Sequence, residues 1–250
     1  MQQESLGPGK VHEPPVRLEL AMQRQPNLET CGPTCLHALY RYYGDSITLE
    51  EVIREVPSLP TGGTLGVMLA CHALRRGYRA RIYSYNLNVF DPTWFEPKAP
   101  DIRERLKVQQ AIKADSKLSL ATDAYLEYLD LGGELRFEDL TKALIRKYLN
   151  KGQPILTGLS GTYLYRSARE FGPNCDYDDV RGEPLGHFVI LSGYDRVGRT
   201  VEIADPLLPN PVSSGHHYQV NIDRVIGSIF LGILTYDANL LLLQPKATKT

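Results

Sequence analysis

The sequence predicts an α+β fold in which N-terminal helices pack on a C-terminal antiparallel sheet. Apolar side chains recur at helical spacing through most of residues 30–150, whereas the last third of the chain is rich in strand-like segments. Helices that come first and strands that come later favour this class over a parallel βαβ series. The length of 250 residues suits a single domain, expected over 17–250.

The N-terminal part of the chain is expected to contain a leader, a short strand and then the start of a helix. Residues 1–16 carry Gly and Pro with almost no apolar periodicity, which indicates a flexible leader. The apolar run 16–22 predicts a first strand. Pro33 is tolerated only in the first turn of a helix, and Gly44 is a natural stop, so a helix is expected to begin at about Thr30 to Gly32.

The middle of the chain continues the helical pattern with one interruption. Helical spacing predicts helices over 48–56, 64–76 and 138–150, and alternation predicts a strand over 79–85. Segment 86–135 fits a compact core less well, although it has helical periodicity of its own. We therefore expect a helical insertion at about 86–135 within the single domain.

The last third supplies most of the predicted sheet. Strands are expected over 154–159, 187–194, 201–204, 217–223 and 229–236. A Gly-containing turn joins the second and third of these strands and predicts an antiparallel hairpin.

Composition excludes several classes of function. Apolar residues make up 42% and charged residues 23% of the chain, and the formal net charge is -1. This balance gives no reason to expect a nucleic-acid partner or an anionic membrane. No apolar stretch approaches the ~20 residues that cross a bilayer, and residues 1–15 lack the apolar core of a signal peptide, so we expect a cytoplasmic protein. No cofactor is expected, and the sequence leaves the oligomeric state open.

Cys31 is the candidate nucleophile among the four cysteines. A thiolate is favoured at a helix N-terminus, where unpaired N–H groups and the helix dipole point at it. Cys31 occupies that position, whereas Cys35 lies one turn further in and is expected to pack inward. Gln25, six residues before Cys31, lies on the loop that enters the helix. Its amide is a candidate donor to the oxyanion that an acyl-transfer reaction forms.

The predicted hairpin provides a base and its partner. His187 begins one strand and Asp205 follows the end of the next, so the two residues should lie nearly opposite each other. A carboxylate in that place can bind one imidazole nitrogen and direct the other toward a thiol.

Two further patterns allow weaker hypotheses. Cys31 with Cys35, and His216 with His217, permit a metal-binding interpretation, but no further ligand stands at suitable spacing. The acidic stretch before His187, which begins at Asp176, is interpreted as a solvated loop rather than a rim for basic substrates.

These residues together resemble a known family. Gln25-x5-Cys31-Gly-Pro-x-Cys, followed by His187-Phe-Val-Ile-Leu-Ser-Gly-Tyr-Asp and Ile203-Ala-Asp205-Pro, is similar to the papain-like peptidases that cleave double-glycine leader peptides. The free-standing bacteriocin-processing peptidase-like proteins look closest. The resemblance implies a papain-like fold, with Cys31 as nucleophile, His187 and Asp205 completing the triad, and Gln25 at the oxyanion hole.

The expected activity is cysteine-dependent hydrolysis of a peptide or isopeptide bond through a thioester. An alternative keeps the triad and resolves the thioester with an amine, as a transpeptidase or amide transferase does. A second alternative is an inactive papain-like module that binds peptides.

Overall fold

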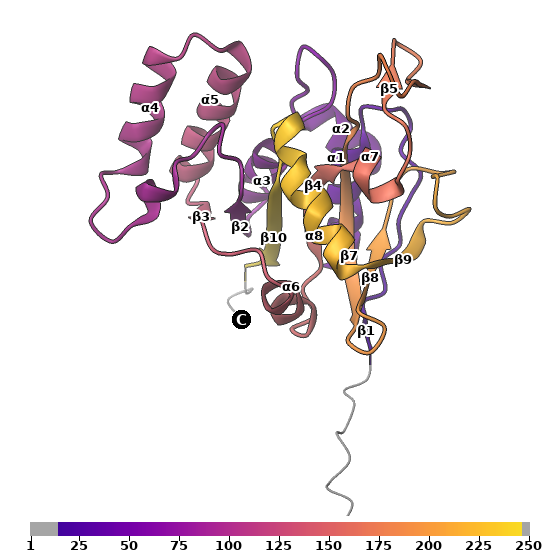
Figure 1. Ribbon diagram of the computed structural model, residues 1–250. Coiled ribbons are helices and arrows are strands. Elements are labelled where there is room, and N and C mark those ends of the chain that lie inside the picture. The colour runs from indigo at the N-terminus through magenta and orange to yellow at the C-terminus, as the bar shows by residue number, and fades with distance from the viewer. Residues whose placement is uncertain (1–14, 247–250) are drawn as a thin grey trace, which may run out of the picture.

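A mixed sheet organises the molecule. The computed structural model describes residues 15–246, and within them an 8-stranded sheet runs in the order β3-β2-β10-β4-β7-β8-β9, with β1 paired to β7 (Figure 1). The strands are β1 Val16–Arg17, β2 Tyr78–Ser84, β3 Glu134–Arg136, β4 Ile155–Ser160, β7 Gly186–Asp195, β8 Thr200–Ala204, β9 His217–Asn221 and β10 Asn239–Pro245. All neighbours pair antiparallel except β2 and β3, which are parallel.

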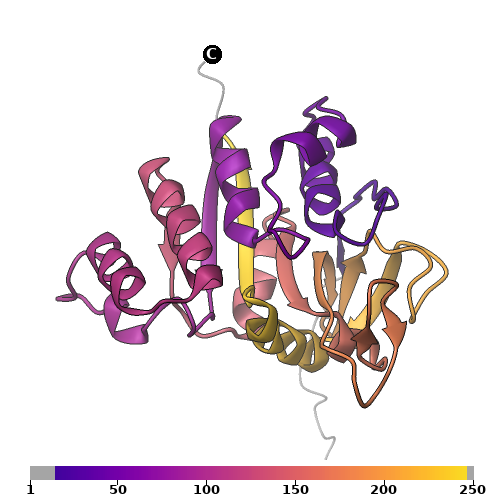
Figure 2. The ribbon, with the colours of Figure 1, turned by 90° about the horizontal axis from the view of Figure 1, so that it is seen from above.

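Helices cover both faces of this sheet (Figure 2). The helices of one face are α1 Cys31–Tyr42, α2 Leu49–Glu55, α3 Gly66–Arg75 and α5 Ser116–Asp130, with α4 Ile102–Ile112 packed on α5. The helices of the other face are α6 Lys142–Leu149, α7 Gly161–Tyr165 and α8 Ile222–Leu231. The α+β class predicted from the sequence is therefore confirmed.

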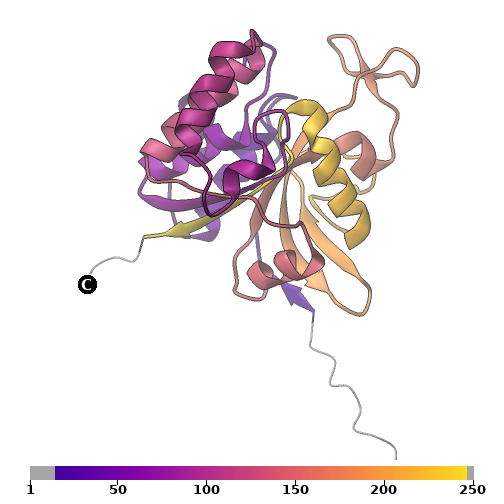
Figure 3. The same ribbon diagram turned by 60° about the vertical axis from the view of Figure 1, so that its left-hand side comes forward.

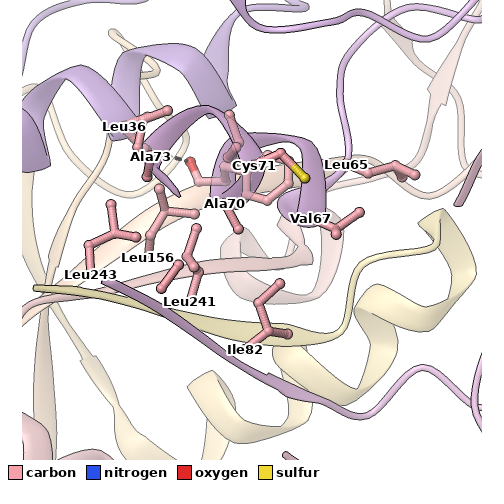
Figure 4. Packing of buried hydrophobic residues seen from close by; sticks show 14 of the residues in the cluster. Leu36, Leu65, Val67, Ala70, Cys71, Ala73, Ile82, Leu156, Leu241 and Leu243 are labelled. Atoms are coloured by element: carbon pink, nitrogen blue, oxygen red, sulfur yellow. Dashed lines mark hydrogen bonds between the residues drawn. The ribbon is translucent and has the colours of Figure 1, made fainter. Parts of the chain in front are cut away.

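Strand alternation explains how one sheet serves two cores. Successive side chains of a strand point to opposite faces. In β7, Phe188 and Ile190 join the core under α1 and α3, whereas Val189 and Leu191 join the core under α6 and α8. Figure 4 shows the first core where α1, α3 and the central strands meet. Its labelled side chains are Leu36, Leu65, Val67, Ala70, Cys71, Ala73, Ile82, Leu156, Leu241 and Leu243.

The predicted strand over 229–236 is wrong, because this part of the chain is helical. Helix α8 begins after Asn221, whose side chain accepts a hydrogen bond from the Asp223 backbone N–H. Ile222, Val225 and Ile229 recur at helical spacing and are all buried. The 3-10 helix η2, Gly232–Thr235, then continues to β10.

The predicted leader and the predicted first strand also differ in extent from the structure. The leader 1–16 falls mostly outside the described residues, but Val16 belongs to β1, opposite Tyr194 of β7. The apolar run 16–22 forms a strand over only Val16–Arg17.

Segment 86–135 contains the 3-10 helix η1, Pro92–Phe95, followed by α4 and α5. These helices stand at one end of the sheet, and the small hairpin of β5, Glu170–Phe171, and β6, Asp176–Tyr177, projects at the other (Figure 3). Helix α5 packs on α3 and thereby joins the main core. Among the described residues, no helix has both the length and the apolar character needed to span a bilayer.

Candidate active site

Cys31 is the first residue of α1, and this residue is 8% exposed. The helix has no acidic residue in its first turn and no side-chain cap on its N-terminal N–H groups. Those unpaired groups favour an anion at this end of the helix. The next residue has to be small, because a Cβ on Gly32 would lie 2.8 Å from Thr64 Cγ2 and 3.2 Å from Phe188 Cδ2. Gly32 thus lets the helix start pack directly against β7.

His187 lies near the start of β7 and is bound to Asp205, which directly follows β8. The distance from His187 Nε2 to Asp205 Oδ1 is 2.9 Å, and both side chains are buried. Burial by itself lowers the pKa of His187. The Asp205 charge, its hydrogen bond and a further hydrogen bond with Cys31 outweigh burial and raise that pKa to about 10.

Asp205 is held as a carboxylate by four donors. Oδ1 accepts from His187 Nε2 and, at 2.9 Å, from the Leu207 backbone N–H. Oδ2 accepts from the hydroxyls of Tyr165 at 2.7 Å and Tyr218 at 2.6 Å. Burial raises the pKa of Asp205, but the His187 charge and these hydrogen bonds overcome it, so the net shift is downward.

Sequence reasoning missed both tyrosines. Tyr165 ends a short helix and Tyr218 lies in β9, so neither residue stands near the hairpin motif in sequence. Their only common feature is the carboxylate that they share in space. Such a contact is visible in the three-dimensional structure, but the spacing of residues along the sequence does not reveal it.

Gln25 is placed beside the Asp205 loop. Its backbone N–H donates to Pro206 O at 3.0 Å, and its side-chain Nε2 donates to Asn27 O at 2.8 Å. Because a carbonyl accepts that bond, the amide nitrogen must face Asn27, and one N–H of the amide stays available. Gln25 Oε1 is buried without a partner among the described residues.

The other thiols have different surroundings. Cys35 is fully buried, its Sγ contacts Phe188 O at 3.3 Å, and burial raises its pKa. Burial also raises the pKa of Cys71 to about 12. Cys175 is partly exposed at the tip of the β5–β6 hairpin, where burial and Glu170 raise its pKa.

The residues of the two weaker hypotheses, the possible metal ligands and the acidic stretch, form other contacts in the structure. His216 Nδ1 contacts the Asp205 backbone O at 2.6 Å, away from any cluster of ligands. Within residues 15–246, no group of three or more His, Cys, Asp or Glu side chains is arranged to hold a metal ion. In the acidic stretch, Asp178 accepts from the backbone and guanidinium of Arg181, as a solvated turn residue does.

A cavity of about 770 Å³ opens beside Cys31. The loop before α1, the loop between α2 and α3, the start of β7 and the loop before β10 form its walls, and the tip of the β5–β6 hairpin borders it. A substrate of peptide size can therefore reach the Cys31 side chain.

The fold identifies the class of protein, and the sequence identifies its family. A sheet with a cysteine-bearing helix on one face and a His–Asp pair at the adjacent strand ends is the arrangement of papain-like cysteine peptidases. Residues 17–225 match the model of the Peptidase_C39 like family. The chain belongs to this family, and it is a papain-like cysteine peptidase. None of the curated proteins matches it.

One solved structure supports the fold, and two others show a lower structural similarity. A putative C39-like peptidase from Bacillus anthracis is 12% identical, with a TM-score of 0.50, over 94% of this chain and 100% of the other. Xylellain, a cysteine protease from Xylella fastidiosa, is 15% identical with a TM-score of 0.44, over 97% and 91%. A double glycine motif protease from an AMS/PCAT transporter, solved with its leader peptide, is 16% identical with a TM-score of 0.45, over 93% and 98%.

Proposed function

We propose that this peptidase hydrolyses a peptide or isopeptide bond by a Cys31–His187–Asp205 triad and a thioester intermediate. The observation that carries the proposal is the buried His187–Asp205 pair, joined at 2.9 Å, together with the interaction of Cys31, at the start of α1, that contributes to the raised pKa of His187. Because Asp205 takes Nε2, the other ring nitrogen, Nδ1, is the one available to the thiol. The family supports a peptide as the substrate, and a cytoplasmic location stays a prediction.

The reaction proceeds in two acyl transfers. His187 takes the Cys31 proton, and the thiolate attacks the carbonyl carbon of the scissile amide. The tetrahedral intermediate collapses, His187 gives the proton to the leaving amine, and the acyl group stays on sulfur as a thioester. Water, deprotonated by His187, then attacks the thioester and releases the carboxylic acid and the thiol.

The oxyanion of each tetrahedral intermediate needs nearby donors. The backbone N–H of Cys31 is one candidate because it lies in the unpaired first turn of α1. The Gln25 amide is the other, since its backbone is bonded beside Asp205 and one N–H of its side chain is not used by Asn27. Loss of one such donor lowers kcat by about 10²–10³-fold in comparable enzymes.

Selective alkylation tests this function without a known substrate. An imidazolium at His187 stabilises a thiolate at Cys31, so limited iodoacetamide at about pH 6 should label Cys31 first in peptide mass maps. His187→Ala should shift the labelling of Cys31 to higher pH. Cys35→Ala, a turn away on the same helix, is the matched control and should leave the pH profile unchanged.

Turnover provides the second measurement. Wild-type protein should hydrolyse members of a fluorogenic peptide-amide library, and Cys31→Ala should abolish this activity. A first label on Cys35, or a pH profile of Cys31 that ignores His187→Ala, would contradict the triad. Mass analysis of products formed with added amine acceptors distinguishes hydrolysis from amide transfer.

A further inference from the structure

Asp237 lies in the wall of the cavity beside Cys31, in the short connection between η2 and β10. It takes no part in the triad. The residue is only 6% exposed, so it carries a buried carboxyl group that borders the space available to substrate. A buried acid needs partners, and the partners of Asp237 are incomplete.

One carboxylate oxygen of Asp237 is bound and the other is not. Oδ1 accepts from the Gly66 backbone N–H at 3.0 Å and from Asn239 Nδ2 at 3.4 Å. Oδ2 receives no hydrogen bond from the residues that the structure describes. Beside it, Asn239 Oδ1 is buried and also lacks a donor. This corner therefore holds two acceptor oxygens without donors among the described residues, and its Asp237 borders the cavity.

The backbone around Asp237 adopts an uncommon conformation. Tyr236 and Ala238, on either side of it, have φ values of 73° and 49°. A non-glycine residue in this left-handed region costs on the order of 1 kcal/mol. Gly158 makes room opposite, because a Cβ there would lie 2.5 Å from Asp237 Cβ. The fold holds this carboxyl in place against local strain, which is typical of functional positions.

Asp237 forms no ion pair within residues 15–246, although the charge of Lys117 acts on it. The other charged side chains on the cavity wall are Glu29, which is exposed, and Lys117. Lys117 Nζ lies 4.9 Å from the centre of the Tyr236 ring, and within residues 15–246 it forms no ion pair with Asp237. Burial raises the pKa of Asp237 to about 7, against the smaller lowering effects of Gly66, Asn239 and Lys117.

We propose that Asp237 is a specificity-determining residue that receives the cationic side chain, Lys or Arg, of a peptide substrate. An ammonium or guanidinium group carries several N–H donors and a positive charge. The unpartnered oxygens of Asp237 and Asn239 lack donors, and the Asp237 carboxylate lacks an ion-pair partner. The proposal rests on the proposed function, since it assigns the cavity to the substrate of Cys31.

Peptide selectivity is the first test. Fluorogenic peptide amides with Arg, Lys, Gln or Met at each position in turn would be assayed at pH 8. We expect one position at which Arg or Lys raises kcat/KM at least tenfold over Gln and Met. Asp237→Asn retains an oxygen for Gly66 but removes the charge, and it should reduce this ratio to within about threefold of one. Asp139→Asn, the same change at an exposed site away from the cavity, should keep the wild-type ratio.

A second test does not require turnover of an amide. In a Cys175→Ser background, Cys31 would be modified at pH 8 with 2-aminoethyl methanethiosulfonate and with neutral methyl methanethiosulfonate. Each reagent forms a mixed disulfide with the thiol and releases methanesulfinate. The ratio of cationic to neutral rates should fall about tenfold or more in Asp237→Asn and stay constant in Asp139→Asn.

The two tests separate the two proposals. If no peptide is turned over, the peptide-hydrolysis function is wrong. If the modification ratio nevertheless depends on charge and Asp237→Asn removes that dependence, the result supports a cation site at Asp237. Turnover without preference for Arg or Lys at any position overturns the Asp237 proposal alone. A preference or a modification ratio that survives Asp237→Asn overturns it as well.

Discussion

Asp205 and Asp237 are both buried aspartates that border the same site, yet their surroundings favour opposite charge states. Asp205 has four donors, including an imidazole that becomes cationic, and its pKa is lowered. Asp237 has two donors, both on one oxygen, and its pKa is raised to about 7. Burial is common to both, so the number and charge of the donors decide which carboxyl stays ionised.

Removing the charge of Asp205 should have the largest effect of any change to this pair. Asp205→Asn leaves His187 without an anionic partner, so the imidazolium is no longer stabilised and the ring tautomer is no longer fixed. We expect kcat/KM on a fluorogenic peptide amide to fall about 10³–10⁴-fold, as in related triads. Asp195→Asn at the other end of β7 is the matched control. Activity within tenfold of wild type in Asp205→Asn would show that the carboxylate does not act through His187.

Removing the charge of Asp237 should instead stabilise the fold, in a pH-dependent way. Its folded pKa of about 7 exceeds the ~3.9 of an unfolded Asp, so the native state loses stability as pH rises from about 4 to 7. Asp237→Asn avoids this loss of about 2–4 kcal/mol, and Tm at pH 8 should rise on the order of 5–10 °C.

Melting curves at pH 4 to 8 measure that difference, which should vanish toward pH 4. The ionisable groups around Asp237 are Lys117 and Tyr125 of α5, with Cys31 and Glu29 across the cavity. A Tm gain in Asp237→Asn that is constant with pH would contradict the raised pKa.

The tyrosine hydroxyls should account for part of the contrast between the two aspartates. Tyr165→Phe or Tyr218→Phe removes one donor from Asp205 and should cost about 1.5–3 kcal/mol of unfolding free energy. The weakened carboxylate should also move the acid limb of the kcat/KM profile to higher pH. Tyr85→Phe is the matched control, because the buried Tyr85 hydroxyl has no partner in residues 15–246. Unfolding curves that match for all three variants would assign no stabilising role to the Asp205 bonds.

The smallest change is expected from Lys117. Its charge lowers the pKa of Asp237 only as a minor contribution. Lys117→Met should decrease KM for a cationic peptide about twofold at pH 8, because one repelling charge leaves the cavity wall. Lys107→Met on the exposed side of α4 is the control. An increase in KM would mean that Lys117 itself contacts the substrate.

The sequence predicted the parts of the site that depend on local pattern. The position of Cys31 follows from Pro33 and the helical spacing behind it, and the hairpin turn brings His187 and Asp205 to neighbouring strand ends. The positions of Tyr165, Tyr218 and Asp237 at the site depend on contacts between distant elements, which spacing does not encode.

The elements of the fold also divide into those that local sequence pattern predicts and those that it does not. Helix α1 was predicted from its periodicity, but β10 was not predicted as a strand, because Leu240–Leu243 is apolar at every position. A central strand that is covered on both faces loses the alternation by which strands are recognised. The run 229–236 is ambiguous for a related reason, since a short apolar run fits a helix or a strand.

The position of β10 bears on how the protein is made. β10 pairs with β2 on one side and with β4 on the other, so the sheet is continuous only after this strand has joined it. In chain order β10 is the last strand of this sheet, so β2 and β3 are joined to the strands that carry His187 only when β10 is in place. The sheet is therefore completed only after β10 has been synthesised, and a nascent chain that lacks this strand has no continuous sheet on which both sides of the cavity beside Cys31 can assemble.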